Sequence, residues 1–353
     1  MQLFIHLKYG MKDRRQFIKV AGTALLGAQV LGGSALAETT GIFTQEILKP
    51  QALKSGDTIA ISSPAGAVWD DAQMEKFTGI IEGLGFKVKT GQTLKEKFGY
   101  FAGTDEMRAK EINTFFADED IRAVFCMKGG WGCARLLDKI DYDLIRKNPK
   151  IIMGFSDITS LLIALYSKTG LVTFHGPVGN SGWNDFSVDY IQRILMKKEA
   201  VSYAYPEKDD DRPYTINPGK AKGVLIGGNL TVLAGIMGSD YLPPWKNKIL
   251  FLEEAKEEPY EVDRMLTQLK LAGVLQNISG FVFGKCAKCE AEEPAKAFTL
   301  KEVLEQHIKP LGIPAFYGAM IGHIENKYTV PIGIEAEMDA GKCTMKLLES
   351  AVL

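Results

Sequence analysis

The sequence has few residues of the kinds that metal centres and disulfide frameworks need. Its 353 residues include five cysteines and four histidines. Cysteine and histidine are the ligands that zinc prefers, and a chain of this size can bury a core without disulfides. Cys286 and Cys289 form the one close cysteine pair, and a single pair is weak evidence for zinc or redox chemistry. We interpret this pair as part of a loop after a strand, with a disulfide as the alternative and no metal.

An excess of charge of one sign is also missing. The chain has 42 lysines and arginines against 43 aspartates and glutamates, a net charge of −1. A nucleic-acid-binding protein would present a basic footprint, so we expect no nucleic-acid partner. Hydrophobic residues make up 46% and charged residues 24% of the chain. These shares are ordinary for globular proteins and exclude a disordered chain or a coiled coil.

The first 37 residues differ from the rest of the chain. Arg14-Arg15 precedes an apolar run from Val20 to about Leu36, and Ala35-Leu36-Ala37 has the small residues of a cleavage site. This pattern resembles a twin-arginine export signal over residues 1–37. We therefore expect a periplasmic protein with no stable membrane partner after cleavage. An N-terminal membrane helix or a chance arginine pair is the alternative.

Short apolar runs alternate with helical patterns from about residue 54. Strands are expected at 58–62, 86–88, 123–127 and 151–155, and helices at 70–84, 104–116 and 157–167. Thr104 is the expected cap of the second of these helices. Regular alternation of strand and helix is typical of a mostly parallel sheet covered on both faces. The sequence therefore predicts the α/β fold class.

A polar stretch rich in helix and strand breakers interrupts this pattern. We place a linker at 201–221, between an N-terminal α/β domain at 45–200 and a C-terminal domain at 222–353. The second half has more expected strands, near 222–226, 249–253, 279–284, 332–337 and 343–348, than helices, near 230–238, 260–272 and 299–308. This balance favours a smaller, mixed β/α second domain.

Ser156 lies between an expected strand and an expected helix, in Gly154-Phe155-Ser156-Asp157. A sharp turn at such a place projects a serine from the sheet, and the next N–H points toward a developing oxyanion. Ile158 stands where a second glycine would complete the usual hydrolase signature. Taken alone, the local sequence favours the simpler role, in which Ser156 caps the following helix.

A glycine-rich turn follows the preceding expected strand. In Lys128-Gly129-Gly130-Trp131-Gly132, adjacent glycines let the backbone approach a ligand closely. If this turn neighbours Ser156, an N–H of Gly129 or Gly130 would complete an oxyanion hole with that of Asp157. The alternative is a structural or phosphate-binding turn, although the spacing of a nucleotide loop is absent.

A serine nucleophile needs a base, and the four histidines limit the choice. His6 lies in or before the signal, and His307 is expected on the surface of an amphipathic helix. His175 ends a strand close to Ser156 in sequence, and His323 ends an apolar run in the second half. The residues alone leave these two equally supported.

The base also needs an orienting carboxylate. Glu253 ends the apolar run 249–252, where a carboxylate has few structural reasons to be. Glu254, Glu257 and Glu258 are expected to be solvated acids that favour the dipole of the next helix.

Together these residues resemble the LD-carboxypeptidase family of serine peptidases, which includes murein tetrapeptide carboxypeptidases and microcin C immunity-type hydrolases. The resemblance covers about residues 54–340, with the matching segments in family order. The segments are Lys54–Asp57, Ser62–Pro64, 128–132, Gly154–Thr159, His175–Pro177, Gly227–Thr231, Leu252–Glu253, Glu258–Tyr260, Asp263–Leu266, Gly322–His323 and Pro331–Gly333.

The resemblance implies a triad of Ser156 as nucleophile, His323 as general base and Glu253 as the orienting carboxylate. It also implies oxyanion donors at Asp157 and at Gly129 or Gly130. A Rossmann-like N-terminal domain, a β-rich C-terminal domain, a homodimer and the absence of a metal or cofactor are further implications of the family.

The sequence departs from the family in its glycine turn, which usually reads Arg-Gly-Gly-Tyr-Gly. Lys128 and Trp131 stand in place of the arginine and the tyrosine, and lysine lacks the bidentate geometry of arginine. We expect Lys128, Trp131 or Arg264 to contact the substrate, with a basic group holding its terminal carboxylate. The export signal is a second departure, because the familiar murein-recycling member works in the cytoplasm.

The expected reaction is cleavage of an L,D-peptide bond that releases terminal D-alanine from a murein tetrapeptide. Hydrolysis of a peptide–nucleotide or acyl-amino acid amide is the enzymatic alternative. The alternative without catalysis is an exported two-domain solute-binding protein, in which Ser156 and Glu253 would contact a ligand.

Overall fold

The computed structural model describes residues 46–203, 205 and 212–353. The expected export signal at 1–37 lies outside these residues, as do residues 204 and 206–211 of the expected linker. Among the described helices, none is both long enough and apolar enough to cross a bilayer.

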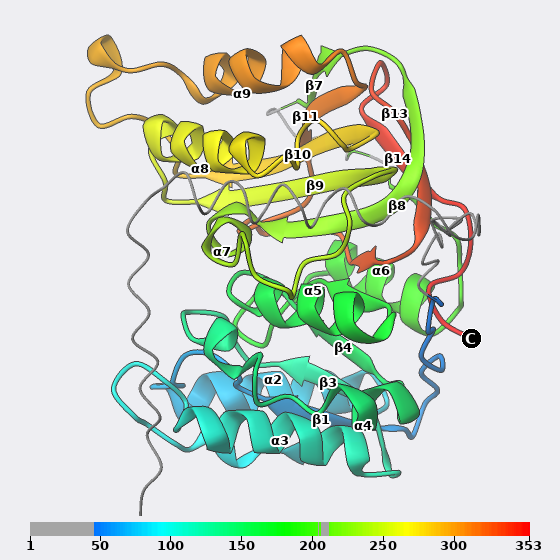
Figure 1. The fold of residues 1–353 in the computed structure, drawn as a ribbon. Coiled ribbons are helices and arrows are strands. Elements are labelled where there is room, and N and C mark those ends of the chain that lie inside the picture. The colour runs from blue at the N-terminus through cyan, green and yellow to red at the C-terminus, as the bar shows by residue number, and fades with distance from the viewer. Residues whose placement is uncertain (1–45, 204, 206–211) are drawn as a thin grey trace, which may run out of the picture. The chain divides into compact units, whose positions relative to one another are not determined.

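The first sheet contains six strands, five of them parallel (Figure 1). Its order is β12-β5-β4-β3-β1-β2, and only β12 runs antiparallel, against β5. The strands are short and almost entirely buried, apart from the edge strand β2, as expected for a parallel sheet covered by helices. They are β1 (Thr58–Ser62), β2 (Lys87–Thr90), β3 (Ile121–Cys126), β4 (Ile151–Gly154), β5 (Thr173–His175) and β12 (Val330–Ile332).

Four of the five helices of this half, all except α5, start at a capping side chain. Asp70 accepts a hydrogen bond from the Ala72 N–H, and Thr104 accepts one from the Met107 N–H, so the expected cap at Thr104 is confirmed. The helices are α2 (Asp71–Gly83), α3 (Asp105–Ala117), α4 (Tyr142–Lys147), α5 (Ile158–Thr169) and α6 (Asp185–Leu195), with 3₁₀ turns η1 (Gln92–Leu94) and η2 (Cys133–Leu136).

The second sheet has eight strands in the order β6-β14-β13-β8-β9-β10-β11-β7. Its centre, β8-β9-β10-β11, is parallel, and the outer strands pair antiparallel. The strands are β6 (Ser202–Tyr203), β7 (Tyr214–Asn217), β8 (Lys220–Asn229), β9 (Lys248–Ala255), β10 (Gly280–Ala287), β11 (Ala315–Ala319), β13 (Glu335–Asp339) and β14 (Thr344–Leu347). The helices are α7 (Leu230–Gly235), α8 (Pro259–Leu271) and α9 (Leu300–Ile308), with η3 (Pro294–Lys296) and η4 (Lys309–Leu311).

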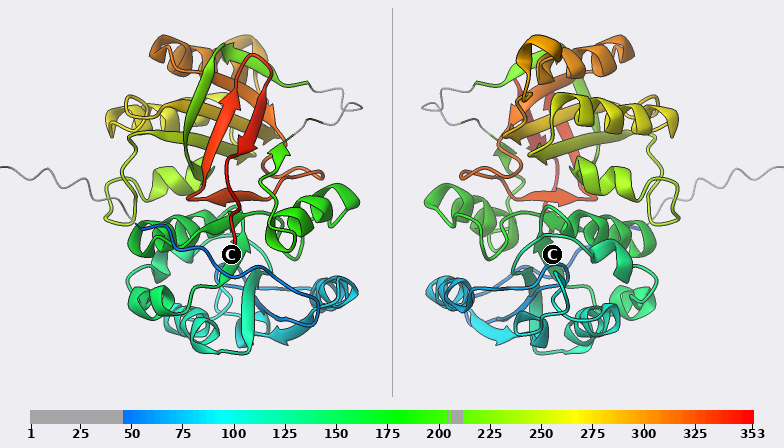
Figure 2. Two further views of the ribbon diagram at one scale, coloured as in Figure 1. Left: turned by 90° about the vertical axis from the view of Figure 1, so that its right-hand side faces the viewer. Right: turned by 90° about the vertical axis from the view of Figure 1, so that its left-hand side faces the viewer.

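Helix α5 lies between the two sheets (Figures 1 and 2). Most of its residues are buried, because one side packs on the first sheet and the other meets β8. A side chain at Gly228 of β8 would lie 2.5 Å from Thr159 Oγ1, and the Asn229 N–H donates to that same oxygen. This close approach brings the end of β8 against the first turn of α5, directly after Ser156.

The predicted α/β class, with a parallel N-terminal sheet and a β-rich second part, is confirmed. The two sheets do not follow the chain order strictly. Strand β12 comes from the predicted second domain but joins the first sheet, and β6 and β7 from the predicted linker are edges of the second sheet. The division into domains at 45–200 and 222–353 stays a prediction.

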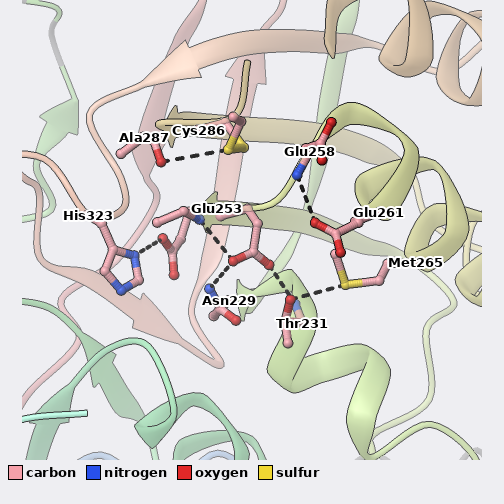
Figure 3. Close-up of a disulfide and its surroundings, with 12 residues drawn as sticks. Asn229, Thr231, Glu253, Glu258, Glu261, Met265, Cys286, Ala287 and His323 are labelled. Carbon is pink, nitrogen blue, oxygen red and sulfur yellow. Dashed lines mark hydrogen bonds and ion pairs between the residues drawn. A yellow bond between two sulfur atoms is a disulfide. The ribbon is translucent and has the colours of Figure 1, made fainter. Parts of the chain in front are cut away.

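The structure decides between the alternatives for the cysteine pair and corrects the placement of one histidine. Cys286 and Cys289 form the disulfide that the sequence left as the alternative, with Cys289 in the turn after β10 (Figure 3). The chain turns back after β10 through Lys288, whose φ is 61°, and this brings the two Cα atoms to 5.6 Å. His307 is mostly buried rather than on the surface, because α9 packs along α8 and its Nε2 lies 2.7 Å from Asp263 Oδ1.

Candidate active site

Ser156 lies in the turn between β4 and α5, with a left-handed backbone at φ 62°. A serine there is strained, and strained residues of this kind gather at functional sites. The capping role is wrong, because the residue that precedes α5 is Asp157. Gly154 permits the sharp turn, since a side chain there would lie 2.9 Å from Ile158. The strand-to-helix turn therefore presents the Ser156 hydroxyl, as expected for a nucleophile.

The glycine turn at 128–132 lies beside Ser156 because β3 and β4 are neighbouring strands. A methyl group at Gly129 would lie 2.9 Å from Ser156 Oγ and 3.4 Å from the Asp157 nitrogen. Gly130 has φ +120°. Within the described part of the chain, the N–H groups of Gly129, Gly130 and Asp157 donate no hydrogen bond, so either glycine remains a candidate donor beside Asp157. An oxyanion hole requires unpaired donors of this kind beside the nucleophile.

The side chain of Asp157 ties the two turns together. It is fully buried, and its Oδ2 accepts a hydrogen bond of 2.8 Å from the Cys133 N–H, where the glycine turn enters η2. Burial raises the pKa of the Asp157 carboxyl, and its Oδ1 has no partner among the described residues. The sequence predicted only a role for the backbone of Asp157, so this side-chain anchor was missed.

His323 and Glu253 form a hydrogen-bonded pair. His323 Nδ1 lies 2.8 Å from Glu253 Oε2. Figure 3 marks this hydrogen bond with a dashed line. Glu253 is fully buried near the end of β9, whereas 31% of the His323 side chain is exposed. An imidazole held at Nδ1 by a buried carboxylate leaves Nε2 available for proton transfer.

The electrostatics keep Glu253 ionised. Burial raises the pKa of Glu253, but the hydrogen bond from His323 and the nearby His175 outweigh burial, so the pKa lies below its usual value. His175 behaves differently, because burial lowers its pKa to about 4. Its buried ring packs edge-on against Phe155, with the two ring centroids 5.9 Å apart. Of the two candidate bases, the geometry supports His323.

Ser156 and His323 line one pocket of about 210 Å³. Of the described residues that line it, none is a lysine or an arginine, and three are acidic: Asp157, Glu254 and Glu257. Burial raises the pKa of Glu257 to about 7, and a hydrogen bond with Glu261 adds to this shift. The pocket thus combines a hydroxyl, an imidazole and an acidic wall.

Glu254 is not the solvated acid that the sequence predicted. Only 3% of it is exposed, because β9 continues to Ala255 and both faces of its end are covered. The Glu254 carboxylate accepts hydrogen bonds from Asn229 Nδ2 and from the N–H groups of Thr231 and Ala255, and burial raises its pKa.

Asn229 is a pocket residue that the sequence analysis did not single out. It pairs with Glu253 across β8 and β9, and its side chain caps α7 by accepting from the Val232 N–H. The signal was present, since asparagine before a helical pattern is a common cap.

The three expected substrate contacts differ in position. Trp131 lines the pocket and is half exposed. Lys128 lies in the same turn, but its Nζ donates to the Ala67 carbonyl at 3.1 Å. Arg264 belongs to α8, and its guanidinium lies over the ring of Tyr260, with Nη2 3.8 Å from Glu261 Oε1. Contacts of these residues with a substrate stay a prediction.

Among the described residues, no group of three or more histidine, cysteine or acidic side chains is arranged to hold a metal ion. The disulfide uses both sulfur atoms of the Cys286–Cys289 pair.

Two family models match the chain. Residues 59–176 match the LD-carboxypeptidase N-terminal domain, and residues 222–338 match the LD-carboxypeptidase C-terminal domain. Together these segments span most of the chain and contain Ser156, Glu253 and His323.

The chain is similar to known proteins in both sequence and fold. The chain is 38% identical to a probable murein peptide carboxypeptidase of Bacillus subtilis, over 86% of this chain and 95% of that one. The solved structure of MccF in complex with glutamyl sulfamoyl guanosine matches with a TM-score of 0.80 and 28% identity, over 87% of this chain and 100% of that one. A muramoyltetrapeptide carboxypeptidase from Oxalobacter formigenes matches with a TM-score of 0.72 and 27% identity, over 82% and 97%. The chain belongs to the LD-carboxypeptidase family of peptidases.

Proposed function

We propose that this protein is a serine-type carboxypeptidase that cleaves an L,D-peptide bond and releases terminal D-alanine from a murein tetrapeptide. The observation that carries the proposal is one pocket that holds a strained Ser156 and a histidine paired with a buried carboxylate. The family of the chain and the names of its murein-peptide relatives support the substrate class.

The first half of the reaction forms an acyl-enzyme. His323 Nε2 takes the proton of Ser156 Oγ as the oxygen attacks the carbonyl carbon of the scissile bond. The buried Glu253 carboxylate holds Nδ1–H and stabilises the imidazolium. The negative charge on the substrate oxygen is stabilised by the N–H of Asp157 and by one from the glycine turn, and one such donor contributes about 3 kcal/mol.

The second half releases the products. His323 passes its proton to the leaving amine, and D-alanine departs as the C–N bond breaks. A water molecule, deprotonated by His323, then attacks the ester carbonyl and frees Ser156 with the tripeptide. Each proton that His323 takes is returned, so the protein ends the cycle unchanged.

Mass spectrometry of the protein incubated with a murein tetrapeptide tests the proposal. We expect loss of one D-alanine, and no loss with Ser156→Ala, which removes the nucleophile without adding bulk. Labelling of Ser156 by a fluorophosphonate probe reports the nucleophile independently of the substrate. Full activity of Ser156→Ala would refute the mechanism, and tight tetrapeptide binding without cleavage or labelling would favour a solute-binding protein.

Hydrolysis of an amide-linked conjugate, such as a peptide–nucleotide or an acyl-amino acid, is the second candidate. The acidic wall of the pocket favours it, because no lysine or arginine among the described lining residues holds a terminal carboxylate. The fold of MccF, solved with glutamyl sulfamoyl guanosine, supports the same chemistry. Cleavage of such conjugates, but not of the tetrapeptide, in a matched panel would select this candidate.

We also propose that the protein is exported to the periplasm and forms a homodimer. The arginine pair Arg14-Arg15 supports export, and a disulfide between Cys286 and Cys289 suits an oxidising compartment. Replacing both arginines by lysine should keep the protein in the cytoplasmic fraction. Light scattering coupled to size-exclusion chromatography tests the dimer, and a monomer mass would contradict it.

A further inference from the structure

Arg108 is a fully buried arginine in α3, and no step of the proposed mechanism uses it. Burying a guanidinium costs free energy unless its charge is paired and its N–H groups have partners. Nη2 of Arg108 donates to Asp105 Oδ1, and the guanidinium lies over the ring of Phe101 at 4.7 Å. The charge is therefore compensated within α3 and the loop before it.

The remaining donors of Arg108 hold three backbone carbonyls. Nε donates to Gly103 at 3.2 Å, and Nη1 donates to Pro64 at 2.6 Å and to Gly132 at 3.1 Å. Gly132 ends the glycine turn and has φ +124°. A side chain there would lie 2.9 Å from Nη1 of Arg108, so the guanidinium occupies the space beside the turn.

These contacts reach both ends of the glycine turn. At one end, the residue after Gly132 is Cys133, whose N–H donates to the Asp157 carboxylate beside Ser156. At the other end, Gly66 of the loop that Arg108 holds at Pro64 donates its N–H to the Gly129 carbonyl at 3.2 Å. A hydrogen-bond network thus connects Arg108 to both ends of the glycine turn and, through Cys133 and Asp157, to the turn that holds Ser156.

We propose that Arg108 is a positioning residue that fixes the oxyanion hole against Ser156. The inference rests on the proposed function. Lysine cannot replace arginine here, because the guanidinium reaches Gly103 from Nε, Asp105 from Nη2, and both Pro64 and Gly132 from Nη1. A single ammonium cannot make all of these contacts at once. A displaced oxyanion donor weakens binding of the transition state more than binding of the substrate.

The test compares Arg108→Lys with Arg135→Lys. Arg135 is a matched control, because it also pairs with Asp105 and lies over Phe101, but its side chain is half exposed. It contacts the glycine turn through its backbone N–H, which donates to the Gly132 carbonyl at 3.2 Å and which lysine keeps. We expect Arg108→Lys to lower kcat by about 10- to 100-fold, less than the loss of a whole oxyanion donor, with KM unchanged within about threefold. Arg135→Lys should keep both constants within about twofold of wild type.

A purely structural role would give a different result. It would lower the melting temperature and the fraction of active protein, but kcat per fluorophosphonate-titrated Ser156 would stay at the wild-type value. Such a result, or an equal loss in Arg135→Lys, would overturn the inference. If Arg108→Lys does not fold, Asp105→Asn keeps the guanidinium and removes the negative charge that Arg108 shares with Arg135. That variant should lower kcat in the same direction, and an unchanged kcat would overturn the inference.

The rate of Ser156 labelling separates this inference from the proposed function, because it needs no peptide substrate. If Arg108→Lys is labelled as fast as the wild-type protein, the positioning role alone is overturned. Wild-type protein that neither cleaves nor reacts overturns the proposed function, and the positioning role with it.

Discussion

Replacing Gly129 by alanine should remove activity and leave the fold intact. The backbone at Gly129 does not have a positive φ, so alanine fits its conformation without strain. The added methyl group would lie 2.8 Å from Ser156 Cβ and 2.9 Å from Ser156 Oγ. Carbon atoms pack best at about 3.5–4.0 Å, so Ser156 must move by roughly 0.7 Å or more to restore an ordinary contact.

The size of the expected loss of activity follows from the role of the space between Gly129 and Ser156. In the proposed reaction, the substrate oxygen must lie about 2.7–3.1 Å from the Asp157 nitrogen, and the methyl group would lie 3.4 Å from that nitrogen. A displacement of about 1 Å at a reacting group costs about 100-fold in rate. We expect kcat/KM to fall at least about 100-fold, and the local overpacking to cost about 1–3 kcal/mol of stability.

Gly79→Ala is the matched control. Gly79 lies in α2, where an added methyl group meets nothing within 4 Å. Alanine should stabilise the helix there by about 0.5–1 kcal/mol and leave activity unchanged. Tetrapeptide hydrolysis and the rate of Ser156 labelling provide the assay, with thermal unfolding as the check on folding. A Gly129→Ala variant within about threefold of wild type would show that the acyl group does not occupy this space.

Three further predictions concern stability. Ser156→Gly should be more stable than Ser156→Ala by about 1 kcal/mol in urea unfolding, because glycine adopts the left-handed backbone without strain and alanine does not. Both variants should be inactive, and equal stabilities would mean that the turn is unstrained. Burial lowers the pKa of His175 to about 4 in the folded protein, whereas a histidine in the unfolded chain has a pKa of about 6.5. As the pH falls, the unfolded chain therefore protonates at this histidine before the folded protein does. Stability should therefore drop between about pH 6.5 and 4, by up to about 3 kcal/mol, and the difference between wild type and His175→Asn should follow that slope; a difference that does not change with pH would contradict the assignment. Replacing both Cys286 and Cys289 by serine should lower the free energy of unfolding by about 2 kcal/mol, the cost expected for so short a loop, and dithiothreitol should destabilise the wild type but not the variant.

Local patterns predicted most of the fold. The strand at 58–62 agrees with β1 to the residue, and Thr104 starts α3 as expected. These elements depend on neighbouring residues, through apolar runs and capping side chains. The pairing of β12 with β5 depends on residues about 155 positions apart, Val330 and His175, and no local pattern encodes such a pair.

Local sequence patterns also predicted some residues of the candidate site, but not all of them. Ser156 stood out because its turn is local, and Glu253 because a carboxylate ended an apolar run. The choice between His175 and His323 needed the family resemblance, since both histidines end apolar segments. Arg108 carried no signal at all, because an arginine on a helix is normally exposed, and only the tertiary contacts of α3 bury it.

The division of the site between the two sheets explains why so many of its neighbours are glycines. Ser156 follows a strand of the first sheet, while Glu253 lies in the second. The base reaches the nucleophile only if the two sheets approach closely, and that approach depends on places without side chains. A Cβ at Gly228 would meet Thr159 in α5, and a Cβ at Gly322 would lie 3.0 Å from Glu253 Oε2, beside His323. Both glycines have positive φ, so any other residue would be strained as well as crowded. The same positions thus set the contact between the sheets and the geometry of the pair that activates Ser156, and stability and activity are coupled at this junction.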